Sequence, residues 1–527
     1  MRRARVLVGC ALSVWGCSRS PTPESAENAP PVVHRVENHS SALIVWRSAK
    51  VRDRVLVHLD GQADIDWLPD LTVARIAATD PLELPELEQH PYTVGARTLD
   101  HFGISNFIYP ATRLGMVREV VWVVPDGTLR DAPAAAALVR EVVLGRLQGI
   151  GIEEARGFHL AGRTVQGTLY NVPITICELA DLPYFAEPVL LDVDLGYFTT
   201  RSALTQHVAD TPWITPEEVL TGLVRKGVRT DRVTLSYSTM GGFLPPDHRW
   251  LGPALQARLE GREVPQEERR YAAMRAEQAG DLGEAEGRYR ALVAADPDDA
   301  SAWFALSRVL TAERRPEARI ALQRAVALDP VLADSTLFAG DRAWWNGDFA
   351  DALARYRDWL AQHPRHPFAL YASRRIAECL LRLDRPQDAM LALEEILRFV
   401  PGHADSRLEL GLLLREQGRL PQAIEQLEAA RASLPEMAHA AMALGQAYLQ
   451  AGEVPRAVVE LEVAVEQRPC WAIAHGQLAA GLARMGRVED ADRHLRLALM
   501  LQPGNPQIRR IAQQLRQSGT RTVAARP

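Results

Sequence analysis

The sequence lacks the patterns that mark several common classes of protein. Only five of its 527 residues are cysteine, and none of them forms the CxxC pair typical of redox and zinc sites. A Walker loop, a nucleophile elbow and a GxGxxG motif after a strand are missing as well. Beyond the N-terminal leader, no run approaches the roughly eighteen apolar residues that a membrane-spanning helix requires. The sequence therefore does not indicate a disulfide framework, and it offers no basis for P-loop, serine hydrolase or dinucleotide chemistry.

An excess of positive charge is also missing. The chain has 60 Lys and Arg against 66 Asp and Glu, a formal net charge of -6, so nucleic acid is not an expected partner. A content of 47% hydrophobic and 24% charged residues is typical of a globular chain. Cys177, Cys379 and Cys470 are far apart in sequence, and we expect them to be buried single thiols.

The N-terminus predicts export from a bacterial cell. Three arginines precede an apolar run, Val6 to Trp15, that is too short to span a bilayer. With Gly16 and Cys17 following, the segment resembles a bacterial lipoprotein signal. That resemblance implies cleavage of residues 1–16, a lipid on Cys17 and anchoring to the membrane on the periplasmic or cell-surface side of the envelope. A plain cleaved signal or an uncleaved anchor stays an alternative, because Trp15 stands where such signals have a small residue.

Residues 17–32 are rich in Ser, Pro, Glu and Asn and have no apolar period. They predict a flexible tether between the lipidated cysteine and a folded domain.

The C-terminal half repeats itself with a period of about 34 residues. Each period contains an alanine followed, at a nearly constant distance, by a proline. The pairs are Ala285 with Pro297, Ala318 with Pro330, Ala352 with Pro364, Ala389 with Pro401, Ala423 with Pro435, Ala457 with Pro469 and Ala491 with Pro503. These offsets resemble the tetratricopeptide repeat, which implies seven helix pairs and a polar closing helix near residues 505–517. An ordinary helical bundle would not reproduce such fixed offsets.

The repeats set the domain layout. We expect an α/β domain over residues 33–255, a linker over 256–265, an all-α solenoid over 266–517 and a disordered tail over 518–527. A solenoid of this kind offers a concave groove to a protein or peptide partner.

Short apolar runs rich in β-branched residues replace the helical period between residues 33 and 255. They are Val55 to Leu59, Val120 to Val124, Pro173 to Cys177, Val189 to Leu191 and Val233 to Ser236. Such runs predict a three-layer α/β fold with a buried, mainly parallel sheet. Sites in these folds lie beyond the carboxyl ends of the strands.

Clustered carboxylates follow two of the runs. Asp60 and Asp64 follow the first, and Asp192 and Asp194 end the fourth. Residues i and i+2 of an extended segment share a face, so these acids can converge. Four carboxylates at one site repel one another unless a cation lies between them, and oxygen ligands with an imidazole suit Mn²⁺, Fe²⁺ or Zn²⁺.

Five segments in order resemble blocks of the arginase and ureohydrolase superfamily, in particular its peptide-arginase-like branch. The segments are Glu37 to Ser40, His58 to Asp64, Gly103 to Pro110, Val121 to Asp126 and Asp192 to Phe198. The resemblance implies two metal ions, most commonly Mn²⁺, that activate water to attack a guanidinium carbon and release urea. In the peptide branch, the substrate is an arginine side chain, which becomes ornithine.

The same resemblance assigns roles to individual residues. It implies that His39, Asp60, Asp64 and Asp192 hold one ion, and that Asp60, Asp192 and Asp194 reach a second. Asp247 stands near the position of a substrate-binding glutamate. His58 lies in a buried strand, and we interpret it as a hydrogen-bonded core residue rather than a catalytic one.

One departure from the family pattern opens a second interpretation. Gln62 stands where the second metal's histidine is expected, and an amide is a poorer ligand than an imidazole. The chain is therefore either a metal-dependent hydrolase of guanidino or amidine C–N bonds, or an inactive arginase-like domain in a protein-binding scaffold. The site holds one or two ions in the first case; in the second case it has lost the second ion and holds one or none.

Overall fold

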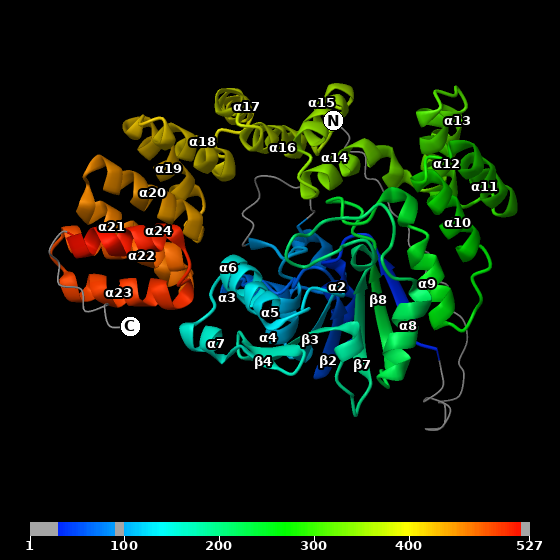
Figure 1. The fold of residues 1–527 in the computed structure, drawn as a ribbon, viewed down its shortest axis with the longest axis horizontal. Helices are drawn as coiled ribbons and strands as arrows, with labels where there is room; N and C mark the ends of the chain where they lie inside the picture. The colour runs from blue at the N-terminus through cyan, green and yellow to red at the C-terminus, as the bar shows by residue number, and fades with distance from the viewer. Residues whose placement is uncertain (1–29, 90–99, 518–527) are drawn as a thin grey trace.

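The computed structural model describes residues 30–89 and 100–517. The expected signal peptide, Cys17, most of the tether and the tail over 518–527 lie outside the described residues. Within them, an α/β domain is followed by an all-helical solenoid (Figure 1). No helix in these two ranges is long and apolar enough to cross a membrane.

The α/β domain is built on one eight-stranded sheet with the order β1-β8-β7-β2-β3-β6-β5-β4. Strands β1 to β3 and β6 to β8 pair with parallel neighbours, whereas β6-β5 and β5-β4 are antiparallel. The strands are β1 (Val32–Val36), β2 (Arg54–Leu59), β3 (Val117–Val124), β4 (His159–Ala161), β5 (Thr164–Leu169), β6 (Val172–Glu178), β7 (Val189–Asp194) and β8 (Thr230–Ser236).

The expected mainly parallel sheet is thus a mixed sheet, and the antiparallel edge has a local cause. Tyr170 and Asn171 join β5 to β6, and both have positive φ, 54° and 65°. Two successive residues of positive φ form the tight turn whose twist matches an antiparallel hairpin. The sequence analysis missed this hairpin because Tyr-Asn is not one of the usual turn pairs.

Both faces of the sheet are buried. Leu56 packs in one hydrophobic core and its neighbour Val57 in the other, as do Trp122 and Val123. Side chains alternate between the faces of a strand, so a strand covered on both sides has a continuous apolar run. The covering helices are α2 (Ser41–Ser48), α3 (Asp70–Ala78), α4 (Ile108–Arg113), α5 (Ala132–Leu138), α6 (Leu144–Arg146), α7 (Ile152–Gly157), α8 (Pro216–Arg225) and α9 (Leu251–Leu259), with the short helices η1 (Leu84–Leu87), η3 (Val139–Val143), η4 (Leu179–Asp181), η5 (Leu195–Phe198) and η6 (Pro246–His248).

The solenoid consists, in its described length, of seven successive helix pairs and the closing helix α24 (Pro506–Gln517). The pairs are α10 (Glu267–Gln278) with α11 (Leu282–Ala295), α12 (Ala300–Ala312) with α13 (Ala318–Leu328), α14 (Ser335–Trp345) with α15 (Phe349–Gln362), α16 (Ala369–Arg382) with α17 (Pro386–Phe399), α18 (Ala404–Glu416) with α19 (Leu420–Ser433), α20 (Ala438–Ala451) with α21 (Val454–Gln467), and α22 (Ala472–Arg484) with α23 (Val488–Leu501). A further short helix, η7 (Pro330–Asp334), precedes α14.

Glycine allows the helices of a pair to approach closely. A Cβ atom on Gly411 would lie 2.6 Å from Leu427 Cγ, and one on Gly445 would lie 2.7 Å from Leu461 Cγ. These distances are shorter than van der Waals contact, so only glycine fits. The repeated Gly positions therefore reflect packing between the helices of each unit.

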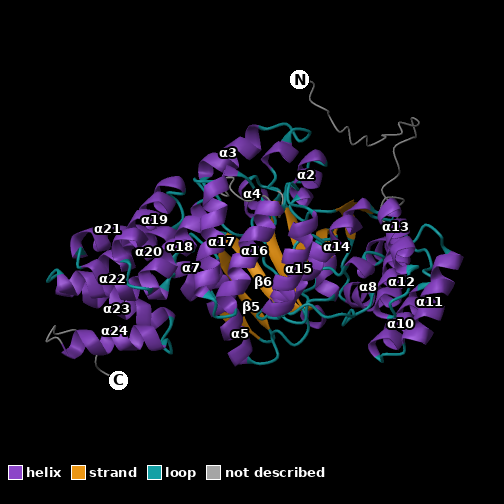
Figure 2. Cartoon of the chain, turned by 90° about the horizontal axis from the view of Figure 1, so that it is seen from above, coloured by secondary structure: helices purple, strands orange, loops and turns teal. Residues whose placement is uncertain are grey.

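The solenoid contacts the α/β domain near both of its ends and arches over it between them (Figures 1 and 2). In the third helix pair, Trp345 Nε1 donates to Gly241 O at 2.8 Å, and Asn346 exchanges two hydrogen bonds with the backbone of Val208. Near the C-terminal end, Gly149 N donates to Gln467 O at 3.2 Å. Gly241 and Val208 lie in the loops after β8 and β7, so this part of the solenoid lies on the carboxyl-end side of the sheet, whereas Gly149 lies between α6 and α7.

The three described cysteines are free and buried, as expected. Cys470 belongs to the solenoid but packs in the core of the α/β domain.

Candidate metal centre

The expected ligands lie at the carboxyl ends of neighbouring strands. His39 follows β1, Asp60 follows β2, and Asp192 and Asp194 end β7. Since β1, β8, β7 and β2 are adjacent in the sheet, their ends meet at one edge. The structure thereby brings together His39, Asp60, Asp64, Asp192 and Asp194, all of them buried.

His39 is the centre of the cluster. Its Nδ1 lies 3.3 Å from Asp60 Oδ2 and 3.1 Å from Oδ2 of both Asp64 and Asp194. Its Nε2 lies 2.8 Å from Asp192 Oδ2. One imidazole edge thus faces three carboxylates, and the opposite nitrogen faces a fourth.

Asp192 connects two imidazoles. Its Oδ2 also lies 2.8 Å from His58 Nδ1, and its Oδ1 accepts a hydrogen bond from Thr234 on β8. Asp194 is held in a similar way, because it accepts hydrogen bonds from Ser238 Oγ and Gly196 N. The two carboxylates of β7 are therefore oriented by β8 and by the loops after both strands.

His58 belongs to this cluster. It is fully buried, its ring stacks on His39 with a centroid distance of 5.3 Å, and its Nε2 lies 3.7 Å from Asp60 Oδ2. The sequence analysis interpreted His58 as a hydrogen-bonded core residue. The structure confirms its burial and its hydrogen bond, but the position of His58 beside His39 was not predicted. The alternation of side chains along β2, which puts His58 and Asp60 on one face, was the signal that could have located it.

Glu88 is a second residue that the sequence analysis missed. Its Oε1 accepts hydrogen bonds from Asn38, Ser40 and Ser41 at 2.6 to 3.0 Å, and thereby holds the turn that carries His39. Glu88 lies 49 residues after His39 and belongs to no recognisable motif, so no sequence pattern could have located it.

The charges of the cluster shift one another's ionisation. Burial alone would lower the pKa of His39, but Asp192, Asp194 and Asp60 raise it well above the ordinary value. Burial, Asp194 and Asp64 raise the pKa of Asp60 to about 8. Burial would also raise the pKa of Asp192, yet the two imidazoles hold it below its ordinary value. These shifts show that the buried groups are strongly coupled: the imidazoles favour the charged form of Asp192, while the neighbouring carboxylates disfavour the charged form of Asp60.

Several polar atoms of the cluster have no hydrogen-bond partner among the described residues. They are His39 Nδ1, His58 Nε2 and Asp64 Oδ1, and all three are buried. Buried polar atoms are rarely left unpaired, and each such atom calls for an explanation. Backbone conformation adds a second sign of constraint, because Asp64 and Ser238 both have positive φ, 48° and 44°. An imidazole nitrogen facing carboxylate oxygens fits a divalent cation of the Mn²⁺, Fe²⁺ or Zn²⁺ type.

Gln62 and Asp247 lie differently from the other expected residues. Gln62 donates its backbone N–H to Asp60 Oδ1 at 3.0 Å, and none of the contacts found within the described ranges joins its side-chain amide to the cluster. Asp247 lies on η6, where Arg308 Nη2 of α12 is 3.0 Å from its Oδ2. Burial would raise the pKa of Asp247, but Arg308, His248 and Arg342 hold it below its ordinary value.

Comparison with known proteins identifies the solenoid. Residues 272–333, 339–404 and 408–469 match the family model of the tetratricopeptide repeat. The C-terminal part of this chain therefore consists of tetratricopeptide repeats, as its sequence pattern predicted. No curated protein matched the chain.

Solved structures similar to the chain include other repeat proteins. A crystal structure of MamA is 22% identical, covers 31% of this chain and 94% of its own, and has a TM-score of 0.29. YrrB, described as a tetratricopeptide protein with an unusual peptide-binding site, is 19% identical over 34% of this chain and 92% of its own, with a TM-score of 0.25. A thermophilic tetratricopeptide protein of Thermus thermophilus is 24% identical over 34% of this chain and 98% of its own, with a TM-score of 0.28.

Proposed function

We propose that the protein is an exported, metal-dependent hydrolase of guanidino or amidine C–N bonds whose solenoid holds a peptide or protein partner. The observation that carries this proposal is the edge of His39. Its buried Nδ1 has no hydrogen bond of good geometry, yet it faces the Oδ2 atoms of Asp60, Asp64 and Asp194 within 3.3 Å. An isolated carboxylate cluster of this kind is costly to bury, and a cation offsets that cost.

The residues of the cluster divide into two groups in this proposal. Asp60, Asp64, Asp194 and the Nδ1 atom of His39 supply the ligand atoms. Asp192 orients the rings of His39 and His58 through its hydrogen bonds, as outer partners of metal ligands commonly do. A bound divalent ion would supply hydroxide at neutral pH and polarise the C–N carbon.

The arrangement of the two domains favours a peptide substrate. The solenoid lies on the side of the sheet where the cluster lies, and repeat solenoids bind extended segments on their concave surfaces. A segment held there has its side chains near the candidate centre. Peptidyl-arginine, which would yield ornithine and urea, is the substrate that the sequence resemblance favours.

Metal binding tests this proposal directly. We expect the purified chain to retain at least one Mn²⁺ ion after dialysis, measured by elemental analysis, and to release urea from an arginine-containing peptide. Asp194→Asn should weaken Mn²⁺ binding, followed by calorimetry, at least about tenfold, because a ligand oxygen loses its charge.

Glu187→Gln is the matched control, because Glu187 is an exposed acid of the same domain, 71% exposed, paired only with Arg118 in the described contacts. This variant should bind Mn²⁺ as the wild type does. Equal binding of Mn²⁺ by the wild type and Asp194→Asn, or no binding by either, would refute the proposed metal centre.

The second candidate is an inactive scaffold, and Gln62 favours it. The side-chain amide of Gln62 has no described contact with the cluster, so a second ion would lack the ligand that its position is expected to supply. In that case the solenoid carries the function by binding a protein partner.

We also propose that Cys17 anchors the protein to the cell envelope through a lipid. Labelled palmitate should appear on the wild type and be absent from Cys17→Ala, which should leave the membrane fraction. A wild type without label has no such anchor.

A further inference from the structure

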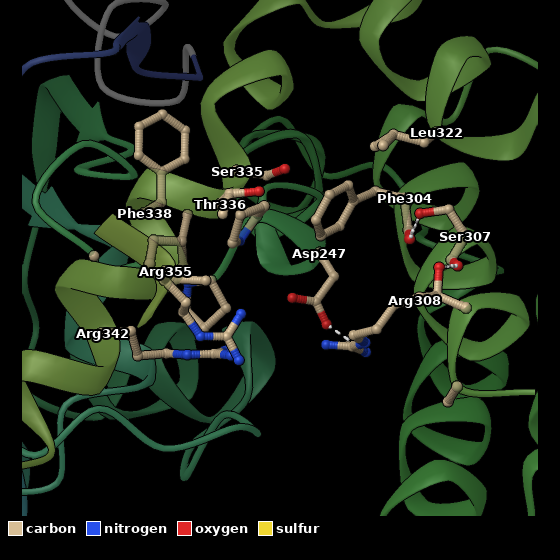
Figure 3. A pocket seen from close by; sticks show the side chains of 17 residues that line it. Asp247, Phe304, Ser307, Arg308, Leu322, Ser335, Thr336, Phe338, Arg342 and Arg355 are labelled. Carbon is tan, nitrogen blue, oxygen red and sulfur yellow. Dashed lines mark hydrogen bonds and ion pairs between the residues drawn. The ribbon is translucent and has the colours of Figure 1, made fainter. Parts of the chain in front are cut away.

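A cavity of about 430 Å³ lies where the loop over residues 242–247 meets the second and third repeats (Figure 3). The α/β domain contributes Leu244, Pro245 and Asp247, and the solenoid contributes residues of α12, α13, α14 and α15. Phe304 and Phe338 are the aromatic side chains of the lining. The cavity is therefore composite, since the α/β loop closes a space that the repeats leave open.

The charged side chains of the cavity are mainly positive. Asp247 is the acid of the lining, and Arg308, Arg342 and Arg355 are its bases. Arg308 is already paired, because its Nη2 lies 3.0 Å from Asp247 Oδ2 and 2.7 Å from Glu277 Oε2. The whole chain has a formal charge of -6, so this positive site is a local exception.

Arg342 and Arg355 have weaker partners. Arg342 Nη1 lies 3.3 Å from Asp210 Oδ1, whose side chain is 74% exposed. Arg355 pairs with Asp351 one turn earlier on its own helix, and both side chains are about two-fifths exposed. Exposed ion pairs contribute little free energy, so a ligand carboxylate can replace them. In Figure 3 the two arginines lie on one side of the cavity, across from Asp247 and Arg308.

We infer that this cavity binds a peptide segment in which an acidic side chain stands next to an aromatic or aliphatic one. The carboxylate would pair with Arg342 and Arg355, since guanidinium groups match carboxylates in geometry and charge. The neighbouring apolar side chain would pack against Phe304 and Leu322, which are partly exposed in the lining, whereas Phe338 is buried behind it. Apolar contacts of this kind add affinity that a bare inorganic anion cannot gain.

The inference rests on the proposed function, because it names the kind of peptide that the solenoid would hold. One loop connects the cavity to the candidate metal centre. Ser238, at its start, donates to Asp194, and Asp247, near its end, lines the cavity. Nine residues of extended chain span at most about 30 Å, so a peptide of modest length bound in the cavity can reach the centre.

Fluorescence anisotropy with the full chain tests the inference. The probe is a fluorescein-labelled peptide, Gly-Ser-Phe-Glu-Glu-Leu-Gly-Ser, with an amidated C-terminus, so that only side-chain carboxylates are present. We expect it to bind at least tenfold more tightly than the same peptide with Gln in place of both Glu residues. Binding should weaken as salt is raised, because the contacts are between charges.

Arg355→Gln and the double variant with Arg342→Gln should each weaken binding of the Glu peptide, the double variant by tenfold or more. Arg357→Gln is the matched control, because Arg357 lies on the same helix, is exposed and does not line the cavity. Arg355 is the safer position, since Arg342 also contacts the α/β domain through Asp210.

Three results would overturn the inference: no binding of the Glu peptide, equal binding of the Glu and Gln peptides, or unchanged binding by both arginine variants. The assay requires neither metal nor hydrolysis. A protein that binds Mn²⁺ and releases urea but does not distinguish the peptides would refute this inference alone. A protein that distinguishes them without binding metal would refute the hydrolase alone.

Discussion

His39 illustrates how single residues create the candidate centre. Its side chain differs from that of an ordinary core histidine, because the ring is fully buried and both ring nitrogens face carboxylates. Glu88 holds the turn before it, and Arg249 donates to both carboxylate oxygens of Glu37 at the end of β1. The imidazole is therefore fixed from both sides of its turn, which is the kind of preorganisation that metal ligands require.

Gln62 decides between enzyme and scaffold, and its replacement by histidine is the sharpest test at the residue scale. We expect Gln62→His to raise bound Mn²⁺ from one ion toward two and to increase urea release from an arginine-containing peptide. The physical reason is that imidazole is a better ligand than an amide for this ion. Elemental analysis and a urea assay measure the two quantities.

Gln62→Asn is the control, because it keeps an amide at the same position and should change neither quantity. The gain should also disappear when Asp192→Ala is added, since Asp192 orients both His39 and His58. If Gln62→His binds no more metal than the wild type and releases no urea, the scaffold interpretation is the better one.

At the scale of elements, close packing within each repeat depends on one position. Gly445 on α20 leaves no room for a Cβ, which would lie 2.7 Å from Leu461 Cγ and 3.2 Å from Ala457 O. Backbone cannot move as easily as a side chain, so the two helices would have to separate. The regular spacing of glycine in the sequence thus reflects the short distance between the two helices of each repeat rather than flexibility of the backbone.

We expect Gly445→Ala to lower the free energy of unfolding by about 1 to 3 kcal/mol, as overpacked positions commonly do. Urea denaturation followed by circular dichroism measures it. Gly287→Ala is the matched control on α11, where the added Cβ meets nothing within 4 Å. There the loss of backbone freedom in the unfolded chain should stabilise the protein by about 0.5 to 1 kcal/mol. Destabilisation of similar size at both positions would show that close packing is not the cause.

At the scale of the whole molecule, the solenoid is attached to the α/β domain near both ends. Asn346 of the third helix pair contacts Val208, and Arg468, which follows the sixth pair, donates to Gly145 O. Between these contacts, the middle repeats lie above the α/β domain in Figure 1 and in front of the strands in Figure 2, where the molecule is seen from above. Two distant attachments hold an extended array more firmly than one, because each contact raises the effective concentration of the groups that form the other.

Asn346→Ala and Arg468→Ala should therefore have a larger effect on the attachment of the two domains when they are combined than when each is made alone. Each alone removes hydrogen bonds worth about 1 kcal/mol and should raise hydrogen exchange only at its own contact. The double variant should raise exchange at both contacts and increase the radius of gyration measured by small-angle X-ray scattering. Arg357→Ala, at an exposed position of α15, should leave scattering unchanged. A double variant that scatters like the wild type would mean that other contacts hold the domains together.

The sequence predicted features that depend on neighbours along the chain. Seven repeat units and a closing helix follow from the spacing of Ala and Pro markers, and the structure places the seven pairs and α24 where these markers put them. The short apolar runs predicted buried strands, and the carboxylates after Leu59 and Leu191 were located at strand ends for the same reason. Features that arise from a turn conformation were harder to predict, and the hairpin at Tyr170 and Asn171 was missed.

By itself, the sequence determined the two-part architecture, the repeat family of the second part and the acids expected at the edge of the sheet. It could do so because periodic burial produces a regular spacing of apolar residues along the chain. Only the tertiary structure decided that His58 lies among these acids and that Glu88 holds the turn of His39. The same holds for the pairing of Asp247 with Arg308 across the two domains and for the position of the solenoid over this edge of the sheet. These contacts join residues separated by tens to hundreds of positions, such as Arg468 and Gly145, and no periodic pattern connects them. They arise when two separately formed surfaces meet, so their partners depend on shape and charge in three dimensions.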